Sequence, residues 1–190
     1  MKNRFLKGAA ASLVILTTLA FTSLNKKEVN VKESKVTWKG EKVTGSHTGT
    51  IQLKEGHFIV EDGNPIGGEF VMDMTSLINT DLSGESKGKL EGHLKSDDFF
   101  GVEKYPTSKL VITSISKKAD GVYGAVGDLT IKNKTNKVTF DLNWKENSAS
   151  TSLSIDRSKY DVRYGSGSFF DNLGDKTIYD NFDLAVVLKF

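Results

Sequence analysis

Two histidines and a pair of neighbouring aspartates are the residues of this sequence best suited to chemistry. His47 and His93 each follow a small residue, and Asp97 and Asp98 lie a few positions beyond His93. A histidine beside a carboxylate supplies a general base, and three such side chains bind zinc. The spacings match no established zinc, nucleophile, phosphate-binding or dinucleotide motif. We therefore predict no catalytic residue, metal ion or cofactor, and keep a secreted His/Asp-based hydrolase or metal-dependent enzyme as the alternative.

Arginine is rare in this lysine-rich chain, so its positions are informative. Beyond Arg4 near the N-terminus, the sequence contains only Arg157 and Arg163. A guanidinium group binds carboxylates through two parallel hydrogen bonds. If both arginines lie at the opening of a cavity, they provide polar contacts for a ligand's head group, and His47 and His93 are candidates for the same role.

A larger set of apolar residues recurs at every second position of several segments. Such stripes are typical of an ordinary packed core. They are equally compatible with an apolar lumen, in which aromatic walls and adaptable methionines accept a hydrocarbon chain. Both interpretations stay open at this point. The lumen candidates are Trp38, Phe70, Met72, Met74, Phe99, Phe100, Leu110, Ile112, Phe140, Leu142 and Trp144.

The elements that position these residues are predicted to be strands, because alternation with period two dominates the chain from Val31 onward. The one long interruption lies between Ser76 and Ser108, and we expect a short helix over 84–94 within it. Expected turns lie at 55–56, 62–65, 120–121 and 134–136, which favours antiparallel hairpins. The expected strands are 34–41, 48–54, 57–61, 67–74, 109–117, 122–132, 137–144, 150–156 and 181–189.

About eight or nine short antiparallel strands form either a sandwich or a barrel. Closure into a barrel removes exposed strand edges, and the inside of an eight-stranded barrel is either filled by side chains or holds one small ligand. The composition, with 37% hydrophobic and 26% charged residues, fits one globular domain.

The N-terminus has the pattern of a secretory signal peptide over residues 1–23. Lys2, Arg4 and Lys7 precede an apolar run that is short for a membrane span. We therefore expect export, to the periplasm in the first place or to the extracellular space, with an uncleaved anchor as the alternative. Without these residues 23 basic and 24 acidic side chains remain, so the formal charge of +2 does not indicate nucleic-acid binding.

One segment of the chain is more specific than the rest: Gly92–Phe100 ends in Ser96-Asp97-Asp98-Phe99-Phe100 and is followed by Tyr105-Pro106. With this segment and several others, the chain resembles the YceI family of exported, polyisoprenoid-binding-like proteins. The resemblance covers roughly residues 31–190. Gly101 and Asp161 depart from it, since an acidic residue and a glycine are usual at these two positions. Further matching segments are Val36–Trp38, Gly45–Gly49, Gly127–Ile131, Thr135–Val138 and Ile155–Tyr160.

The resemblance implies an all-β fold: an eight-stranded, antiparallel, lipocalin-like barrel with a short helical insertion. It also implies a hydrophobic channel that holds a long-chain isoprenoid or a related amphipathic lipid. We therefore predict a non-enzymatic lipid-binding protein for transport, storage or sequestration, in transient contact with membranes. A ligand-free, stress-related interaction module is a further alternative, and the sequence leaves the oligomeric state open.

Overall fold

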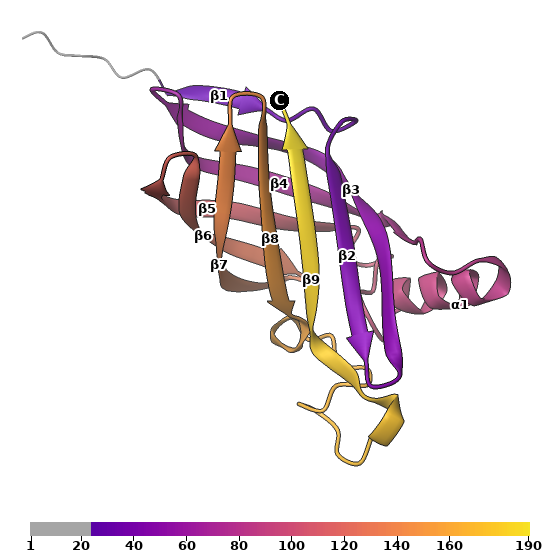
Figure 1. The fold of residues 1–190 in the computed structure, drawn as a ribbon. Coiled ribbons are helices and arrows are strands. Elements are labelled where there is room, and N and C mark those ends of the chain that lie inside the picture. Colours follow the sequence, from indigo (N-terminus) through magenta and orange to yellow (C-terminus); the bar gives the residue numbers. More distant parts are fainter. Residues whose placement is uncertain (1–23) are drawn as a thin grey trace, which may run out of the picture.

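The computed structural model describes residues 24–190, which form one antiparallel sheet that curves round and closes on itself (Figure 1). The predicted signal peptide lies outside the described residues. The helix α1 spans Gly84–Lys95, and two short 3-10 helices span Arg157–Tyr160 and Gly174–Lys176. The strands are β1 (Asn25–Glu28), β2 (Lys35–Lys42), β3 (Gly45–Glu61), β4 (Asn64–Asn79), β5 (Thr107–Ala119), β6 (Val122–Ile131), β7 (Lys134–Lys145), β8 (Ser148–Asp156) and β9 (Ile178–Lys189).

The strand order closes the barrel and confirms the predicted all-β, lipocalin-like fold. The sheet runs β1-β3-β2-β9-β8-β7-β6-β5-β4, and a further pairing of the last strand, β4, with β3 closes the ring. The strands β2 to β9 therefore form the closed ring. β1 was not predicted: it pairs with residues 57–60 of β3, beyond the residues 45–51 that pair with β2.

The prediction of a turn at Glu55-Gly56 is wrong, because β3 continues through both residues as one 17-residue strand. Gly56 is opposite Phe70 in the β3–β4 ladder. A Cβ atom on Gly56 would lie 2.6 Å from Cδ1 of that ring. The glycine therefore makes room for an aromatic side chain, and the sequence alone does not distinguish this use from a turn.

The turn expected at 134–136 lies earlier, at Lys132 and Asn133. Both residues have positive φ values, 48° and 58°, as a two-residue type I′ hairpin requires. Lys134 is already paired with Ile131. The helix expected over 84–94 is confirmed as α1, which packs beside β4 and has no buried residue.

Two hydrophobic clusters fill the two ends of the barrel. One gathers around Phe58, Phe70 and Leu142. The other gathers around Phe99, Phe100 and Tyr160, beneath the loop that joins β8 to β9. Within residues 24–190, no helix has both the length and the apolar character needed to span a membrane.

The two departures from the family pattern both lie in left-handed backbone. Gly101 has φ +57°, and Asp161 has φ 62°. Aspartate is one of the few residues that adopt this conformation readily. The carboxylate of Asp161 also accepts a hydrogen bond of 2.5 Å from Arg163 Nε, a contact that a glycine could not make.

Candidate functional site

An apolar cavity lies inside the barrel between the two hydrophobic clusters, with a volume of about 180 Å³. Alternation along each strand directs every second side chain inward, and all eight strands of the ring contribute to the lining. All the lumen candidates except Trp144 line this cavity: Trp38, Phe70, Met72, Met74, Phe99, Phe100, Leu110, Ile112, Phe140 and Leu142.

Trp144 lies outside the cavity, at the end of the barrel near the β7–β8 hairpin. Its ring stacks on Phe190 with centroids 4.8 Å apart and meets Phe58 edge-on at 4.9 Å. The indole Nε1 donates a hydrogen bond of 3.1 Å to the carbonyl oxygen of Gly63. The ammonium group of Lys27 lies 4.4 Å from the centroid of the Phe190 ring. Trp144 therefore helps to close this end of the barrel.

Phe99 and Phe100 cover the other end of the barrel. Both side chains are buried, and their ring centroids lie 5.1 Å apart. The guanidinium carbon of Arg157 lies 5.3 Å from the centroid of Phe99. Arg157 thus lies beside the aromatic rings that cover this end.

The Arg157 side chain lines the cavity, but its hydrogen bonds are made to the protein. Its three nitrogens donate to the carbonyl oxygens of Tyr179, Val162 and Ile178, at 3.2, 2.8 and 2.9 Å. The nearest carboxylate is that of Asp180, at 3.5 Å. Burial lowers the pKa of Arg157, and Asp180 opposes this shift. The arginine therefore holds the loop after β8 against β9, and ties the cavity's cover to its wall.

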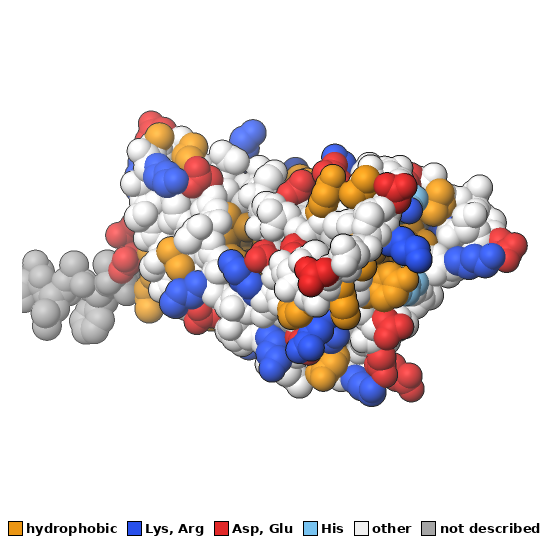
Figure 2. Space-filling view, turned by 90° about the horizontal axis from the view of Figure 1, so that it is seen from below, with side chains coloured by type: hydrophobic (Ala, Val, Ile, Leu, Met, Phe, Trp, Pro, Cys, Tyr) orange, Lys and Arg blue, Asp and Glu red, His pale blue; other side chains and the backbone are white. Residues whose placement is uncertain are grey.

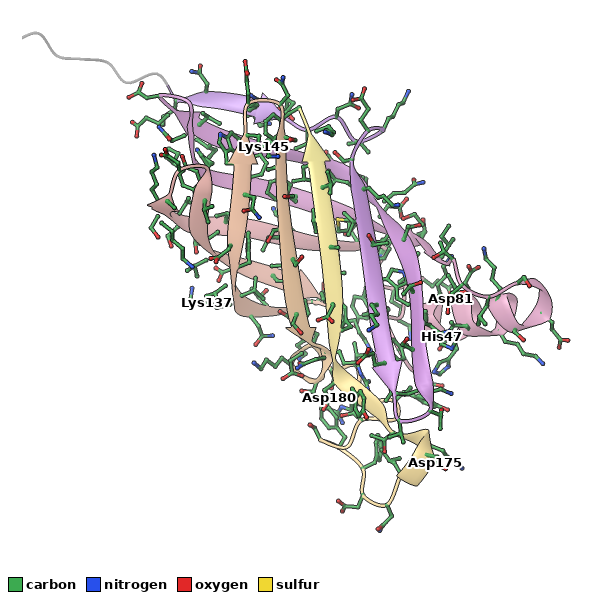
Figure 3. All side chains as sticks on the ribbon, in the orientation of Figure 1. His47, Asp81, Lys137, Lys145, Asp175 and Asp180 are labelled. Carbon is green, nitrogen blue, oxygen red and sulfur yellow. The ribbon has the colours of Figure 1, made fainter. Side chains whose placement is uncertain are left out.

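The other three predicted polar contacts lie outside the cavity lining. Arg163 is exposed and pairs with Asp161. His93 extends from α1 and packs edge-on against Tyr164, with ring centroids 4.3 Å apart. His47 contacts a different residue, Asp81, at 3.0 Å between Nδ1 and Oδ2 (Figure 3).

Asp81 was not predicted from the sequence, and it is the centre of a small polar cluster beside the barrel. Partial burial tends to raise the pKa of Asp81. Hydrogen bonds from His47, from the backbone N–H of Thr48 and from Asn79 outweigh that effect and lower the pKa to about 2. The side chain of Asn79 is fully buried and also donates to the carbonyl oxygen of Thr48. The cluster joins the end of β4 to β3, a long-range contact that no local motif indicates.

The histidine–aspartate pairs of the enzymatic alternative do not form. Asp97 pairs with Lys104 at 2.5 Å. No hydrogen bond or ion pair joins His47 or His93 to Asp97 or Asp98 among the described residues. Across residues 24–190, no three histidine, aspartate or glutamate side chains gather closely enough to bind one metal ion.

Two further features of the lining were not recognised from the sequence. Gly40 lines the cavity, and a Cβ atom built on it would meet no atom within 4 Å. Trp38 is half-buried, and its Nε1 is shielded from solvent without a hydrogen-bond partner. A buried, unpaired donor is costly, at about 1–3 kcal/mol. The wall of the cavity therefore contains one open position and one polar group with unused bonding capacity.

Comparisons with known proteins agree with the barrel and its motifs. A family model described as the YceI-like domain matches residues 28–190. A UPF0312 protein of Shewanella denitrificans is 32% identical over 107 residues, which cover 50% of this chain and 56% of that protein. The chain thus spans about half the length of the curated relatives it matches.

Two solved structures have the same fold at low sequence identity. BcnA of Burkholderia cenocepacia has a TM-score of 0.65 and 22% identity, over 84% of this chain and 98% of that one. A polyisoprenoid binding domain of Saccharophagus degradans, described as implicated in plant cell wall breakdown, has a TM-score of 0.58 and 12% identity. That match covers 87% of this chain and 97% of the other.

Proposed function

This chain belongs to the YceI family, and from that premise we propose that it binds a long-chain isoprenoid or another amphipathic lipid inside its barrel. The observation that carries the proposal is the cavity, whose wall is formed almost entirely by aliphatic, aromatic and methionine side chains. The polyisoprenoid binding domain of Saccharophagus degradans, which has the same fold, suggests the chemical class of the ligand.

The energetics of such a site favour a chain without many polar groups. Each methylene transferred from water into the cavity contributes about 0.8 kcal/mol. Met72 and Met74 lie side by side on the inward face of β4 and line the cavity. Their unbranched side chains change rotamer at little cost, so the wall is suited to chains of differing shape.

The proposed role is binding, in transport, storage or sequestration, without a chemical step. Transient contact with membranes is part of this proposal. The loop between β8 and β9, at the end covered by Phe99 and Phe100, exposes the rings of Tyr164, Phe169 and Phe170. The view from below in Figure 2 has hydrophobic side chains among both basic and acidic ones. Tyrosine is enriched at the membrane–water boundary, and phenylalanine occurs on the apolar face of segments that lie in it.

Export is a separate part of the proposal, supported by the basic and apolar pattern of residues 1–23. Expression of the full chain with a C-terminal tag in a Gram-negative host, followed by fractionation and intact-mass measurement, tests it. Recovery of a shortened protein from the periplasm or the medium is the expected result. Recovery of the full-length mass from the cytoplasm would contradict export.

Mass spectrometry of bound lipid tests the binding proposal directly. The protein is purified without detergent, extracted with organic solvent, and the extract is compared with that of a Leu142→Glu variant. Leu142 is 2% exposed and lines the cavity, so an added carboxylate there disfavours an apolar ligand. We expect a stoichiometric long-chain lipid in the wild-type extract alone. Folded wild-type protein that stays empty after incubation with bacterial lipid vesicles would refute the proposal.

A further inference from the structure

The barrel wall is incomplete along one pair of strands. β7 and β8 are paired only from Asn143 to Lys145, opposite Ser148 to Ser150, next to their hairpin. β7 is paired with β6 from Lys134 to Asn143, and β8 is paired with β9 along its whole length. The last link between the two strands is the Thr151 hydroxyl, which donates to the carbonyl oxygen of Asp141 at 2.7 Å.

Beyond that link, no ladder pair joins residues 134–142 of β7 to residues 151–156 of β8. We call this unpaired stretch the β7–β8 seam. Successive residues of a strand direct their backbone groups to alternate neighbours. Since Asp141 directs its carbonyl to β8, Thr139 and Lys137 direct theirs to the same side, into the seam. The wall is therefore held there by fewer hydrogen bonds than between any other neighbours in the ring.

A second cavity of about 310 Å³ lies over the seam, and its lining is mostly polar. Three of its lining residues, Val138, Leu153 and Asn181, also line the apolar lumen. The two cavities therefore share a wall that is no more than a few side chains thick. The polar side chains of this cleft are Lys137, Thr139, Ser154, Asp156, Lys159 and Asn181.

The lumen is small for a long-chain ligand, so the polar cleft beside it is relevant to how such a ligand binds. Pockets for small organic ligands usually measure about 300–1,000 Å³, whereas the lumen measures about 180 Å³. A long chain therefore fills the lumen with only part of its length, and the remainder must lie elsewhere. Trp144 and Phe190 close one end, while Phe99 and Phe100 cover the other.

The charges around the cleft are compensated within the protein. Lys137 pairs with Asp128 at 3.2 Å, and Lys159 approaches Asp156 at 3.8 Å. Two of the remaining polar groups are the hydroxyls of Thr139 and Ser154, which donate and accept hydrogen bonds. This lining suits an uncharged head group, such as an alcohol or a carbonyl, better than a multiply charged phosphate.

We propose that the lumen opens sideways through the β7–β8 seam, and that the polar cleft binds an uncharged, hydrogen-bonding head group of the ligand. The inference rests on the proposed lipid-binding function, and it adds the chemical class of the head group and the route by which the chain reaches the lumen.

Cross-linking tests the route, because the chain contains no cysteine of its own. Extending the β7–β8 register by four residues on each strand places Thr139 opposite Ser154. A Thr139→Cys/Ser154→Cys variant is linked with a short bifunctional thiol reagent. The matched control is Ser152→Cys/Ala185→Cys, two direct partners in the fully paired β8–β9 ladder. Uptake of retinol, a fluorescent isoprenoid alcohol, is followed with and without the cross-link.

We expect the cross-link over the seam to slow retinol uptake by about tenfold or more, and the control cross-link to leave it unchanged. A Thr139→Val/Ser154→Ala variant tests the head-group site. Loss of both hydroxyls should weaken retinol binding about fivefold, as expected for one hydrogen bond, and leave binding of the corresponding hydrocarbon unchanged.

The outcomes separate the two proposals. If neither retinol nor the hydrocarbon binds to any folded variant, the lipid-binding function itself fails. If both bind, but cross-linking leaves the uptake rate unchanged and removal of the hydroxyls weakens neither ligand, the seam and its cleft have no role and this inference is overturned.

Discussion

Filling the open position at Gly40 should strengthen the fold and weaken ligand binding at the same time. A Cβ atom on Gly40 meets nothing within 4 Å, its φ lies outside the left-handed region, and the residue lines the lumen. The lumen volume of about 180 Å³ exceeds a cavity of about 150 Å³ that holds benzene in another protein. The Cβ atom of a leucine at position 40 therefore lies in open space, and the lumen has volume for the rest of the side chain.

The expected magnitudes follow from the carbon atoms of the added side chain. Burial of a leucine side chain contributes about 1.5–3 kcal/mol, so the free energy of unfolding of the ligand-free protein should rise by about 2 kcal/mol. The same side chain displaces about four methylenes of a bound chain, at about 0.8 kcal/mol each. The resulting loss of about 3 kcal/mol corresponds to a dissociation constant raised about 100-fold.

Chemical denaturation and retinol titration of Gly40→Leu measure the two effects. Gly88→Leu is the matched control, because Gly88 also has open space around it but lies on α1, away from the lumen. The control should leave retinol affinity unchanged. Unaltered affinity in a folded Gly40→Leu protein would refute the placement of the ligand in the lumen, and a destabilised variant would refute the description of the space beside Gly40.

Three other substitutions have distinct expected outcomes. Trp144→Ala should lower the free energy of unfolding by about 2–3 kcal/mol in chemical denaturation, below the range for a fully buried tryptophan because this ring is half-buried; a loss under about 1 kcal/mol would contradict its role in closing one end of the barrel. Trp38→Phe removes the unpaired Nε1 donor. It should leave retinol affinity unchanged, and it should leave the melting temperature unchanged or raise it. Weaker retinol binding with an unchanged melting temperature would indicate that this donor bonds to the ligand. Asp81→Asn should lower stability at neutral pH by about 1 kcal/mol, a figure that allows for solvent screening of this partly exposed carboxylate. Because folding lowers the pKa of Asp81 from 3.8 to about 2, its contribution is present above pH 3.8 and is lost as the pH falls toward 2. Urea denaturation across that pH range should therefore give a flatter acid limb for Asp81→Asn than for wild type, and parallel limbs would contradict the assignment.

Local patterns predicted most of the barrel, because the alternation of apolar and polar residues along a strand indicates which of its faces points inward. Val138, Phe140 and Leu142 repeat at every second position, and their inward direction follows from the pleat of a strand. Trp144 continues the same alternation and yet lies outside the lumen. Alternation indicates the face of the sheet but not the height along the barrel, and Trp144 stands at the height where Phe190 and Phe58 close the end.

The polar residues were harder to place, because their partners are distant in the sequence. His47 was considered together with Asp97 and Asp98, but its partner is Asp81, which the closure of β3 onto β4 brings beside it. Arg157 was expected at a cavity opening, and it does line the cavity. Its three nitrogens are nevertheless used by backbone carbonyls of the following loop and of β9.

The sequence by itself determined the class of fold, the strand faces and the family, since all three depend on residues that are close together in the chain. Only the tertiary structure decided that β3 runs unbroken through Gly56, that Gly40 leaves a space in the wall, and that β7 and β8 separate beyond Thr151. These features depend on how strands far apart in sequence meet around a closed ring, where the space left between side chains is a property of the whole barrel.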